Sequence, residues 1–258
     1  MQDLKLTLVQ IDQIWEDKAS NYSKYEHIFQ NLDDTDLIVL PEMFNTAFTM
    51  NVAELAEDWN DSTGIEFLKN WGKKLNTAFY TSLIVKDNDR YFNRGVFVFP
   101  DGQIEYYDKR KSFGLAGEDR FFTAGKEEKI VNYRGWKINL QICYDLRFPE
   151  LIRNRMVNNN EASYDLLIYV ANWPDKRKYH WTSLLTARAL ENQCYVVGVN
   201  RVGLDGKELN YSGNSAAFSP LGEVISEEND FAECISNVDL SHNSLLEIRK
   251  SLPFLKDV

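Results

Sequence analysis

The fold class of this 258-residue chain is decided by "LKLTLVQIDQIWEDKASNYSKYEHIFQNLDDTDLIVL" (residues 4–40). Residues 4–11 alternate polar and apolar side chains in the manner of a strand. Residues 18–32 have the pattern of a helix, and residues 37–40 form a short apolar run typical of a buried strand. A strand, a helix and a second strand in this order predict an α/β fold.

The rest of the chain continues this alternation and adds hairpins. Strand-like runs occur at 79–85, 94–99, 103–108, 129–133, 136–142, 165–171, 194–200 and 216–225. Helical patterns occur at 64–76, 181–192 and 240–251, the last with Ser241 as its N-cap. Turn signals at 100–102 and 134–135 predict antiparallel hairpins, so the sheets are expected to be mixed. Because no repeat or linker interrupts the pattern, we expect one domain over 1–258.

Charge and cysteine content exclude several classes of protein. The chain has 29 basic and 39 acidic residues and a net charge of −10, which disfavours binding to nucleic acid or to an anionic membrane. The first residues lack the pattern of a signal peptide, and no apolar run approaches a membrane span. Cys143, Cys194 and Cys234 form no CxxC pair. This predicts a cytoplasmic protein without a disulfide framework or zinc site.

Three reactive side chains follow three predicted strands. Glu42 follows the run at 37–40, Lys109 follows "IEYYD", and Cys143 ends the apolar run "INLQI". Functional residues of α/β sheets gather just beyond the carboxyl ends of strands. We therefore expect a carboxylate, an ammonium and a thiol to meet at one sheet edge.

This trio has the chemistry of a covalent hydrolase. A thiol is a nucleophile only as thiolate, so Glu42 is the candidate base. Lys109 is placed to stabilise an oxyanion, together with the backbone N–H of Tyr144. A helix beginning near Phe148 would add a favourable dipole. Taken singly, each residue also has an ordinary explanation as a core cysteine or a loop charge, but together they complete a mechanism.

The surrounding motifs resemble those of the nitrilase, or carbon–nitrogen hydrolase, superfamily. The matching segments are "LIVLPEMF" (37–44), "YYDKRKSF" (106–113), "GEDRFFTAG" (117–125), "ICYDLRFPE" (142–150), "YVANWP" (169–174), "LLTARALENQCYVVGVNRVG" (184–203) and "SGNSAAFSPLGEVI" (212–225). The resemblance covers nearly the whole chain. It implies a Glu-Lys-Cys triad of Glu42, Lys109 and Cys143, with Glu118 as a further glutamate.

The resemblance is strongest to bacterial ω-amidases of the YafV type, which are similar to the mammalian Nit2-type enzyme. It implies a four-layer α-β-β-α sandwich and hydrolysis of the terminal amide of a short dicarboxylate such as 2-oxoglutaramate. No metal or organic cofactor is implied. Members usually form dimers or larger assemblies through helices, and 181–192 is the candidate interface helix. That helix is equally consistent with an ordinary core position.

The distal carboxylate of such a substrate requires a cationic partner. Arg147 and Lys111 are the candidates, although Arg147 has a structural alternative as an ion pair with Asp145 or Glu150. Candidate pocket walls are the aromatic residues Phe48, Phe113 and Trp173, which also suit a core. Lys111-Ser112 stands where relatives usually have His-Leu, a change that affects the pocket wall and substrate preference.

Three alternatives remain open from the sequence. The first is a Cys-His thiol hydrolase that pairs Cys143 with His180, although no papain or caspase signature is present. The second is another superfamily hydrolase that acts on a nitrile, an N-carbamoyl amine or another aliphatic amide. The third is a binding or scaffold protein that keeps the fold without turnover.

Overall fold

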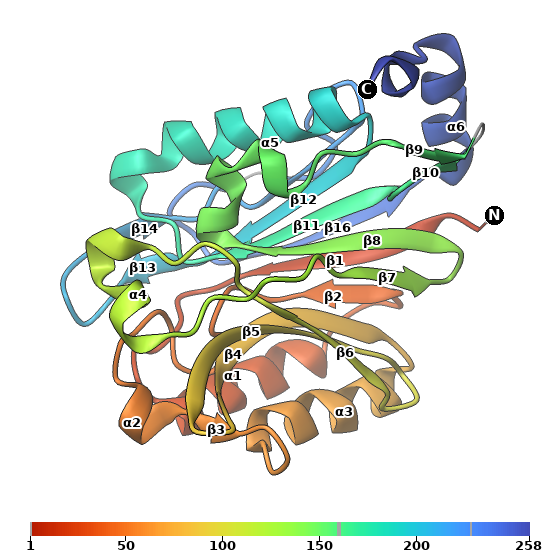
Figure 1. Ribbon diagram of the computed structural model, residues 1–258. Coiled ribbons are helices and arrows are strands. Elements are labelled where there is room, and N and C mark those ends of the chain that lie inside the picture. Colours follow the sequence, from red (N-terminus) through yellow and green to blue (C-terminus); the bar gives the residue numbers. More distant parts are fainter. Residues whose placement is uncertain (1, 159–160, 228) are drawn as a thin grey trace.

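The computed structural model describes residues 2–158, 161–227 and 229–258. Its elements form four layers (Figure 1). Helices α1 (Lys18–Phe29) and α3 (Thr63–Leu75) form the first layer, and α5 (Lys178–Asn192) lies in the fourth. Two sheets lie between them. The predicted α-β-β-α sandwich is confirmed.

The first sheet has seven strands in the order β16-β1-β2-β4-β5-β6, with β3 paired to β4. Strands β1, β2 and β4 are parallel, whereas β16, β5 and β6 add antiparallel pairs. The bounds are Leu4–Gln10 (β1), Leu37–Val39 (β2), Glu57–Asp58 (β3), Ala78–Asp87 (β4), Arg90–Val98 (β5), Ile104–Asp108 (β6) and Cys234–Leu240 (β16).

The second sheet has five strands in the order β15-β12-β11-β8-β7. Strands β8, β11 and β12 are parallel, and their carboxyl ends therefore share one edge. The bounds are Ile130–Tyr133 (β7), Trp136–Ile142 (β8), Leu166–Ala171 (β11), Tyr195–Asn200 (β12) and Ala216–Phe218 (β15). Two small hairpin sheets join β9 (Met156–Asn158) to β10 (Glu161–Ala162) and β13 (Val202–Leu204) to β14 (Asn210–Ser212).

Apolar side chains on both faces of the first sheet hold the layers together. Leu6 and Leu8 of β1 belong to the core shared with the second sheet, whereas Val9 packs in the core under α1 and α3. The helix side of that second core includes Phe29 and Leu68, both fully buried. Burial of a large apolar side chain stabilises the fold by about 1.5–3 kcal/mol, so these two interfaces keep the strand ends in register.

Local sequence signals are confirmed at several places. The turns at 100–102 and 134–135 join β5 to β6 and β7 to β8 as antiparallel pairs. Helix α6 (His242–Ser251) begins after Ser241, whose side chain accepts a hydrogen bond from the backbone of Ser244. Two shorter helices are α2 (Val52–Leu55) and α4 (Glu118–Phe121).

The helix expected near Phe148 is not formed. Two short 3₁₀ turns, η2 (Cys143–Arg147) and η3 (Pro149–Leu151), occupy the segment, and further 3₁₀ turns are η1 (Gly114–Ala116), η4 (Asp175–Arg177) and η5 (Phe254–Asp257). Phe148 caps η3 and Pro149 opens it, as expected for a helix start, but Ile152, with φ −130° and ψ 15°, ends it after three residues. No helix dipole from this segment therefore acts on the thiol.

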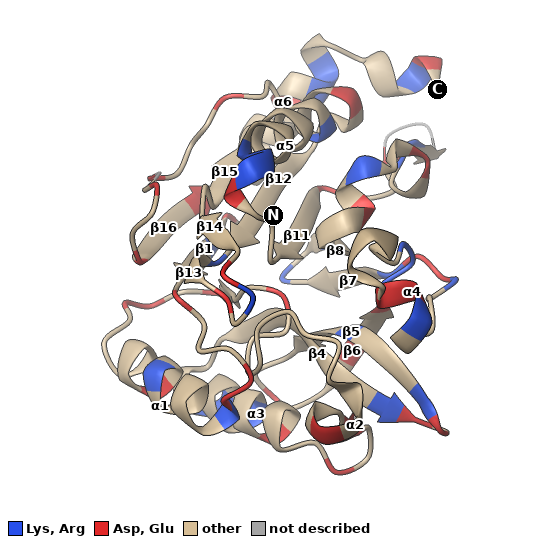
Figure 2. Ribbon diagram, turned by 90° about the vertical axis from the view of Figure 1, so that its left-hand side faces the viewer, with Lys and Arg blue, Asp and Glu red and all other residues tan. Residues whose placement is uncertain are grey.

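Charged residues lie mainly on helices and connecting segments (Figure 2). Strands β11 and β12 carry none and are fully buried. In the described part of the chain, no helix has the length and apolar character needed to cross a membrane.

Candidate active site

The three predicted reactive residues lie just past strand ends, but on two sheets. Glu42 follows β2 and Lys109 follows β6 in the first sheet, whereas Cys143 follows β8 in the second. The expected single sheet edge was therefore wrong, because the sandwich brings the edges of two sheets together. All three residues are buried, with exposures of 0%, 3% and 8%.

Lys109 is the centre of a buried ionic cluster. Its Nζ lies 3.0 Å from Oε1 of Glu42 and 2.9 Å from both carboxylate oxygens of Glu118. Glu118, at the start of α4, also accepts a hydrogen bond from the backbone N–H of Phe113 at 2.6 Å. One ammonium therefore faces two carboxylates, which leaves the cluster with an excess of negative charge.

Two asparagines that the sequence analysis did not single out hold the Glu42 carboxylate. Nδ2 of Asn93, in β5, donates to Oε1 of Glu42 at 2.7 Å and to Glu118 at 3.1 Å. The backbone N–H of Asn172 donates to Oε2 of Glu42 at 2.9 Å. Asn172 follows the end of β11 and so obeys the same strand-end signal as Cys143.

The backbone is strained at the reactive residues. Cys143 has φ +45°, and Met43, directly after Glu42, has φ +48°. A non-glycine residue in this region costs roughly 1–3 kcal/mol, and such strain clusters at functional sites. The Cys143 thiol is held against the carbonyl oxygen of Asn172, 3.9 Å from Sγ.

Burial and neighbouring charge set the protonation states. Burial, followed by the negative charge of Glu42, raises the pKa of Cys143 well above its usual value, although Lys109 acts in the opposite direction. Cys143 is therefore a protonated thiol at rest, and a base would have to take its proton before the sulfur could act as a nucleophile. Burial alone would lower the pKa of Lys109, but the charges of Glu118 and Glu42 outweigh it and raise that pKa. Lys109 accordingly stays a cation.

Asp145 is a further buried carboxyl group beside the nucleophile. It accepts hydrogen bonds from the Tyr107 hydroxyl at 2.8 Å, the Lys111 backbone N–H at 2.9 Å and the Ile142 backbone N–H at 3.1 Å. These bonds join the segment after Lys109 to the turn that carries Cys143. Burial raises the pKa of Asp145 to about 6.

A narrow cavity of about 20 Å³ opens onto the thiol, with room for about one water molecule. It is lined by Phe113, Cys143, Tyr144, Arg147, Asn172, Trp173, Pro174 and Arg177. Of the predicted substrate-binding residues, Phe113, Arg147 and Trp173 lie here, together with Arg177, which the sequence did not single out.

The other two predicted substrate-binding residues lie outside this lining. The Lys111 ammonium is 3.8 Å from Glu150 and 4.6 Å from the centre of the Phe148 ring. The Phe48 ring is instead 5.5 Å from Nζ of Lys109. Lys111 contributes its backbone N–H to Asp145, so its side chain is directed elsewhere.

Arg147 does not form the structural ion pair considered as its alternative. Its Nη2 lies 3.2 Å from Nδ1 of His180, and its guanidinium stacks 4.6 Å from the centre of the Trp173 ring. Because a guanidinium only donates, Nδ1 of His180 is the acceptor. His180 therefore contacts Arg147, and the contact of the Cys143 thiol is with Asn172.

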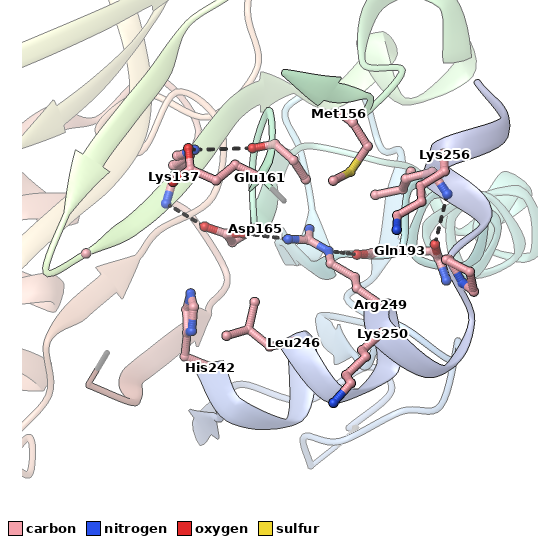
Figure 3. A pocket seen from close by; sticks show the side chains of 14 residues that line it. Lys137, Met156, Glu161, Asp165, Gln193, His242, Leu246, Arg249, Lys250 and Lys256 are labelled. Atoms are coloured by element: carbon pink, nitrogen blue, oxygen red, sulfur yellow. Dashed lines mark hydrogen bonds and ion pairs between the residues drawn. The ribbon is translucent and has the colours of Figure 1, made fainter. Parts of the chain in front are cut away.

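A second cavity, of about 250 Å³, lies beside α6 and contains none of the predicted catalytic residues (Figure 3). Arg249 reaches across it to Asp165 at 2.7 Å and to the carbonyl of Gln193 at 2.8 Å. Lys137 lies 3.2 Å from Glu161. These residues lie near the amino ends of β8, β11 and β12, at the opposite edge from Cys143.

Comparison with known proteins identifies the family. The carbon–nitrogen hydrolase family model matches residues 5–250. The chain belongs to the carbon–nitrogen hydrolase family. This hydrolase is 41% identical to "Omega-amidase YafV" of Yersinia enterocolitica over 100% of the chain and 97% of the relative. It is 31% identical to "2-oxoglutaramate amidase" of Bacillus subtilis over 98% and 96% of the two chains.

Solved structures support the same assignment. The hydrolase superposes on XC1258 of Xanthomonas campestris with a TM-score of 0.96 and 38% identity, over 100% of this chain and 98% of that one. That structure is described as a CN-hydrolase superfamily protein with an arsenic adduct in its active site. Nit3 of Saccharomyces cerevisiae, a nitrilase superfamily member, matches with a TM-score of 0.86 and 25% identity, over 99% and 96% of the chains.

Proposed function

We propose that this hydrolase cleaves the terminal amide of a short dicarboxylate monoamide, such as 2-oxoglutaramate, to the acid and ammonia through a thioester on Cys143. The observation that carries the proposal is the buried contact of the Lys109 ammonium with Glu42 at 3.0 Å and Glu118 at 2.9 Å, beside the thiol. The substrate class is supported by the names of the two curated relatives and by Arg147 in the thiol cavity.

In the first half-reaction, sulfur attacks the amide carbon while Glu42 takes the thiol proton. The carbonyl electrons form an oxyanion, which Lys109 and the Tyr144 backbone N–H stabilise. When the carbon–nitrogen bond breaks, the nitrogen takes the proton from Glu42 and ammonia leaves. The acyl group remains on Cys143 as a thioester.

In the second half-reaction, Glu42 removes a proton from water as the water oxygen attacks the thioester carbon. The carbon–sulfur bond breaks, and the proton held by Glu42 returns to sulfur. Glu118 assists by balancing the Lys109 charge throughout, because both of its oxygens lie 2.9 Å from Nζ. The residues return to their starting protonation states, so the cycle needs no further reactant than water.

The test is mass spectrometry of the protein quenched during turnover of a poor amide substrate. We expect an acyl adduct on the peptide that carries Cys143, with the mass of the acid part of the substrate. The matched control is Cys194, a second fully buried thiol. Cys143→Ala should lose both the adduct and ammonia release, whereas Cys194→Ala should keep both. Ammonia release by Cys143→Ala at the wild-type rate would overturn the mechanism.

The proposal extends to the setting of the enzyme. We propose one catalytic domain over the whole chain, a cytoplasmic location and a homodimer or larger homo-oligomer. Helix α5 suits the interface because Trp181 and Leu185 face its own sheet, whereas Tyr179 and Leu190 are 77% and 50% exposed. The native mass in solution is the measurement: a monomer at all concentrations would exclude the assembly.

A further inference from the structure

The pocket at the thiol contains two guanidinium groups, those of Arg147 and Arg177. They reach it from different elements, because Arg147 ends the turn after β8 and Arg177 ends the turn before α5. Both are partly exposed. Each is held on an aromatic wall of the same cavity: Arg147 lies 4.6 Å from the centre of the Trp173 ring and Arg177 lies 5.4 Å from that of Phe113.

Neither guanidinium forms an ion pair with an acidic side chain of the described residues. Three arginines elsewhere behave differently: the buried Arg94 and Arg201 and the partly buried Arg249 each lie 2.6–2.7 Å from a carboxylate. Two unpaired cations in one pocket are unexpected in a chain of net charge −10. The arrangement is that of an anion site.

Three carboxylates close in sequence to the arginines face other groups, and none of them forms an ion pair with Arg147 or Arg177. The Asp145 carboxylate accepts from Tyr107 and from two backbone N–H groups. Glu150 and Asp175 lie 3.8 Å from the ammonium groups of Lys111 and Lys178, and Oδ1 of Asp175 has no hydrogen-bond partner among the described residues. The charge of the pair is therefore left for a ligand.

We infer that Arg177 and Arg147 together clamp the distal carboxylate of the substrate, and that Arg177 determines the preference for acidic over neutral amides. The inference rests on the proposed function, since it places the scissile amide at Cys143. A guanidinium fork matches a carboxylate with two parallel hydrogen bonds. Burial and the neighbouring charge of Arg177 lower the pKa of Arg147, and a carboxylate between the two cations relieves their repulsion.

The test compares two amides of equal carbon number. Glutaramate, the monoamide of glutaric acid, carries the distal carboxylate, and pentanamide lacks it. Arg177→Gln is expected to lower kcat/KM for glutaramate about 10- to 100-fold, the range for a charged hydrogen bond. The same substitution should change kcat/KM for pentanamide less than about twofold. The matched control is Lys176→Gln, which removes an exposed neighbouring cation outside the cavity lining and should change neither.

A charge-reversing variant keeps the inference testable if Arg177→Gln is poorly folded. Arg177→Glu should reject glutaramate and accept 5-aminopentanamide, whose distal group is a cation. Equal losses on all amides in both variants, or an unchanged preference for glutaramate, would overturn the role of Arg177. Failure of the proposed function would be seen separately, as a wild-type enzyme that does not favour glutaramate over pentanamide.

Discussion

Two charged clusters differ in stoichiometry: one lies at the amino ends of the five-stranded sheet, and the other lies between the two sheets, beside Cys143 at the carboxyl end of β8. At the amino ends of the strands, Arg249 meets Asp165 at 2.7 Å, and its other donors bind the carbonyls of Gln193 and Tyr164. The second oxygen of Asp165 accepts from the backbone of Lys137. One cation meets one carboxylate, and each guanidinium nitrogen and each carboxylate oxygen forms a hydrogen bond. Such a cluster fastens α6 to the sheet.

In the second cluster, the balance is different. The Lys109 ammonium forms ion pairs with both Glu42 and Glu118. This cluster lies beside Cys143, whose backbone is strained. The excess carboxylate gives this cluster a group able to accept a proton, which the Arg249 cluster lacks.

The largest expected effect is on the unequal cluster. Glu42→Gln keeps the shape but removes the proton acceptor, so kcat for amide hydrolysis should fall about 10³-fold. The control is Glu57→Gln, which alters another buried glutamate that accepts from Lys18 and Gly64. That variant should lose stability while it keeps kcat. The measurement is the steady-state rate of ammonia release. A kcat of Glu42→Gln within tenfold of the wild-type kcat would contradict the role of Glu42 as the base.

The equal cluster should show the reverse behaviour. Arg249→Met leaves Asp165 buried without its cation, which is expected to reduce the free energy of unfolding by about 3 kcal/mol. Turnover per folded molecule should be unchanged, because α6 lies at the opposite sheet edge. Urea unfolding and kcat measured on the same samples test this. Arg249→Lys keeps the positive charge but not the planar guanidinium, so its free energy of unfolding should fall less than that of Arg249→Met. A fall in kcat in either variant would contradict the expectation that this cluster has no part in turnover.

A smaller effect is expected at Asp145, through pH. Its pKa is raised from 3.8 to about 6 in the folded protein, so the folded state binds this proton more tightly than the unfolded state. The contribution of this proton binding to the free energy of unfolding is fully present below pH 3.8 and is lost as the pH rises through about 6. Between pH 4.5 and 7.5, it should fall by about 2 kcal/mol.

Asp145→Asn has no such titration. The difference in unfolding free energy between wild type and variant should therefore shrink as the pH rises from 4.5 to 7.5. Urea unfolding at several pH values measures that difference. A constant difference would show that the carboxyl group does not titrate in this range.

The smallest effect is expected for His180→Ala. The imidazole accepts from Arg147 at 3.2 Å and contacts no reacting group in the cluster. We expect KM for glutaramate to rise less than about threefold, with kcat retained, as for loss of one partly exposed hydrogen bond. A loss of kcat near that of Glu42→Gln would instead favour the Cys-His alternative.

Much of this fold was predictable because its signals are local. Strand β1 shows alternation, Ser241 is a good cap for α6, and turn residues lie between β5 and β6. The expected helix after Phe148 is only the three-residue turn η3, which Pro149 opens and Ile152 ends. Segment type could thus be derived, but not the geometry of the turn after Cys143.

The site was predictable where its residues end strands. Asn172 directly follows β11 and could have been found by the same rule, whereas Asn93 lies inside β5 without any local signal. Arg177 enters the pocket only because η4 turns the chain towards Cys143. Lys111 stays a prediction as a substrate-binding residue: its side chain lies 3.8 Å from Glu150, and its N–H donates to Asp145.

By itself, the amino-acid sequence determined the alternation of strands and helices and the side chains that stand at strand ends, including Glu42, Lys109 and Cys143. Periodicity and turn chemistry report only interactions between residues near one another in the chain. The tertiary structure alone decided that two different sheets supply the triad, that one ammonium serves two carboxylates, and that two unpaired guanidinium groups share the thiol pocket. Those properties arise when sheet packs on sheet, a long-range contact that local patterns do not encode.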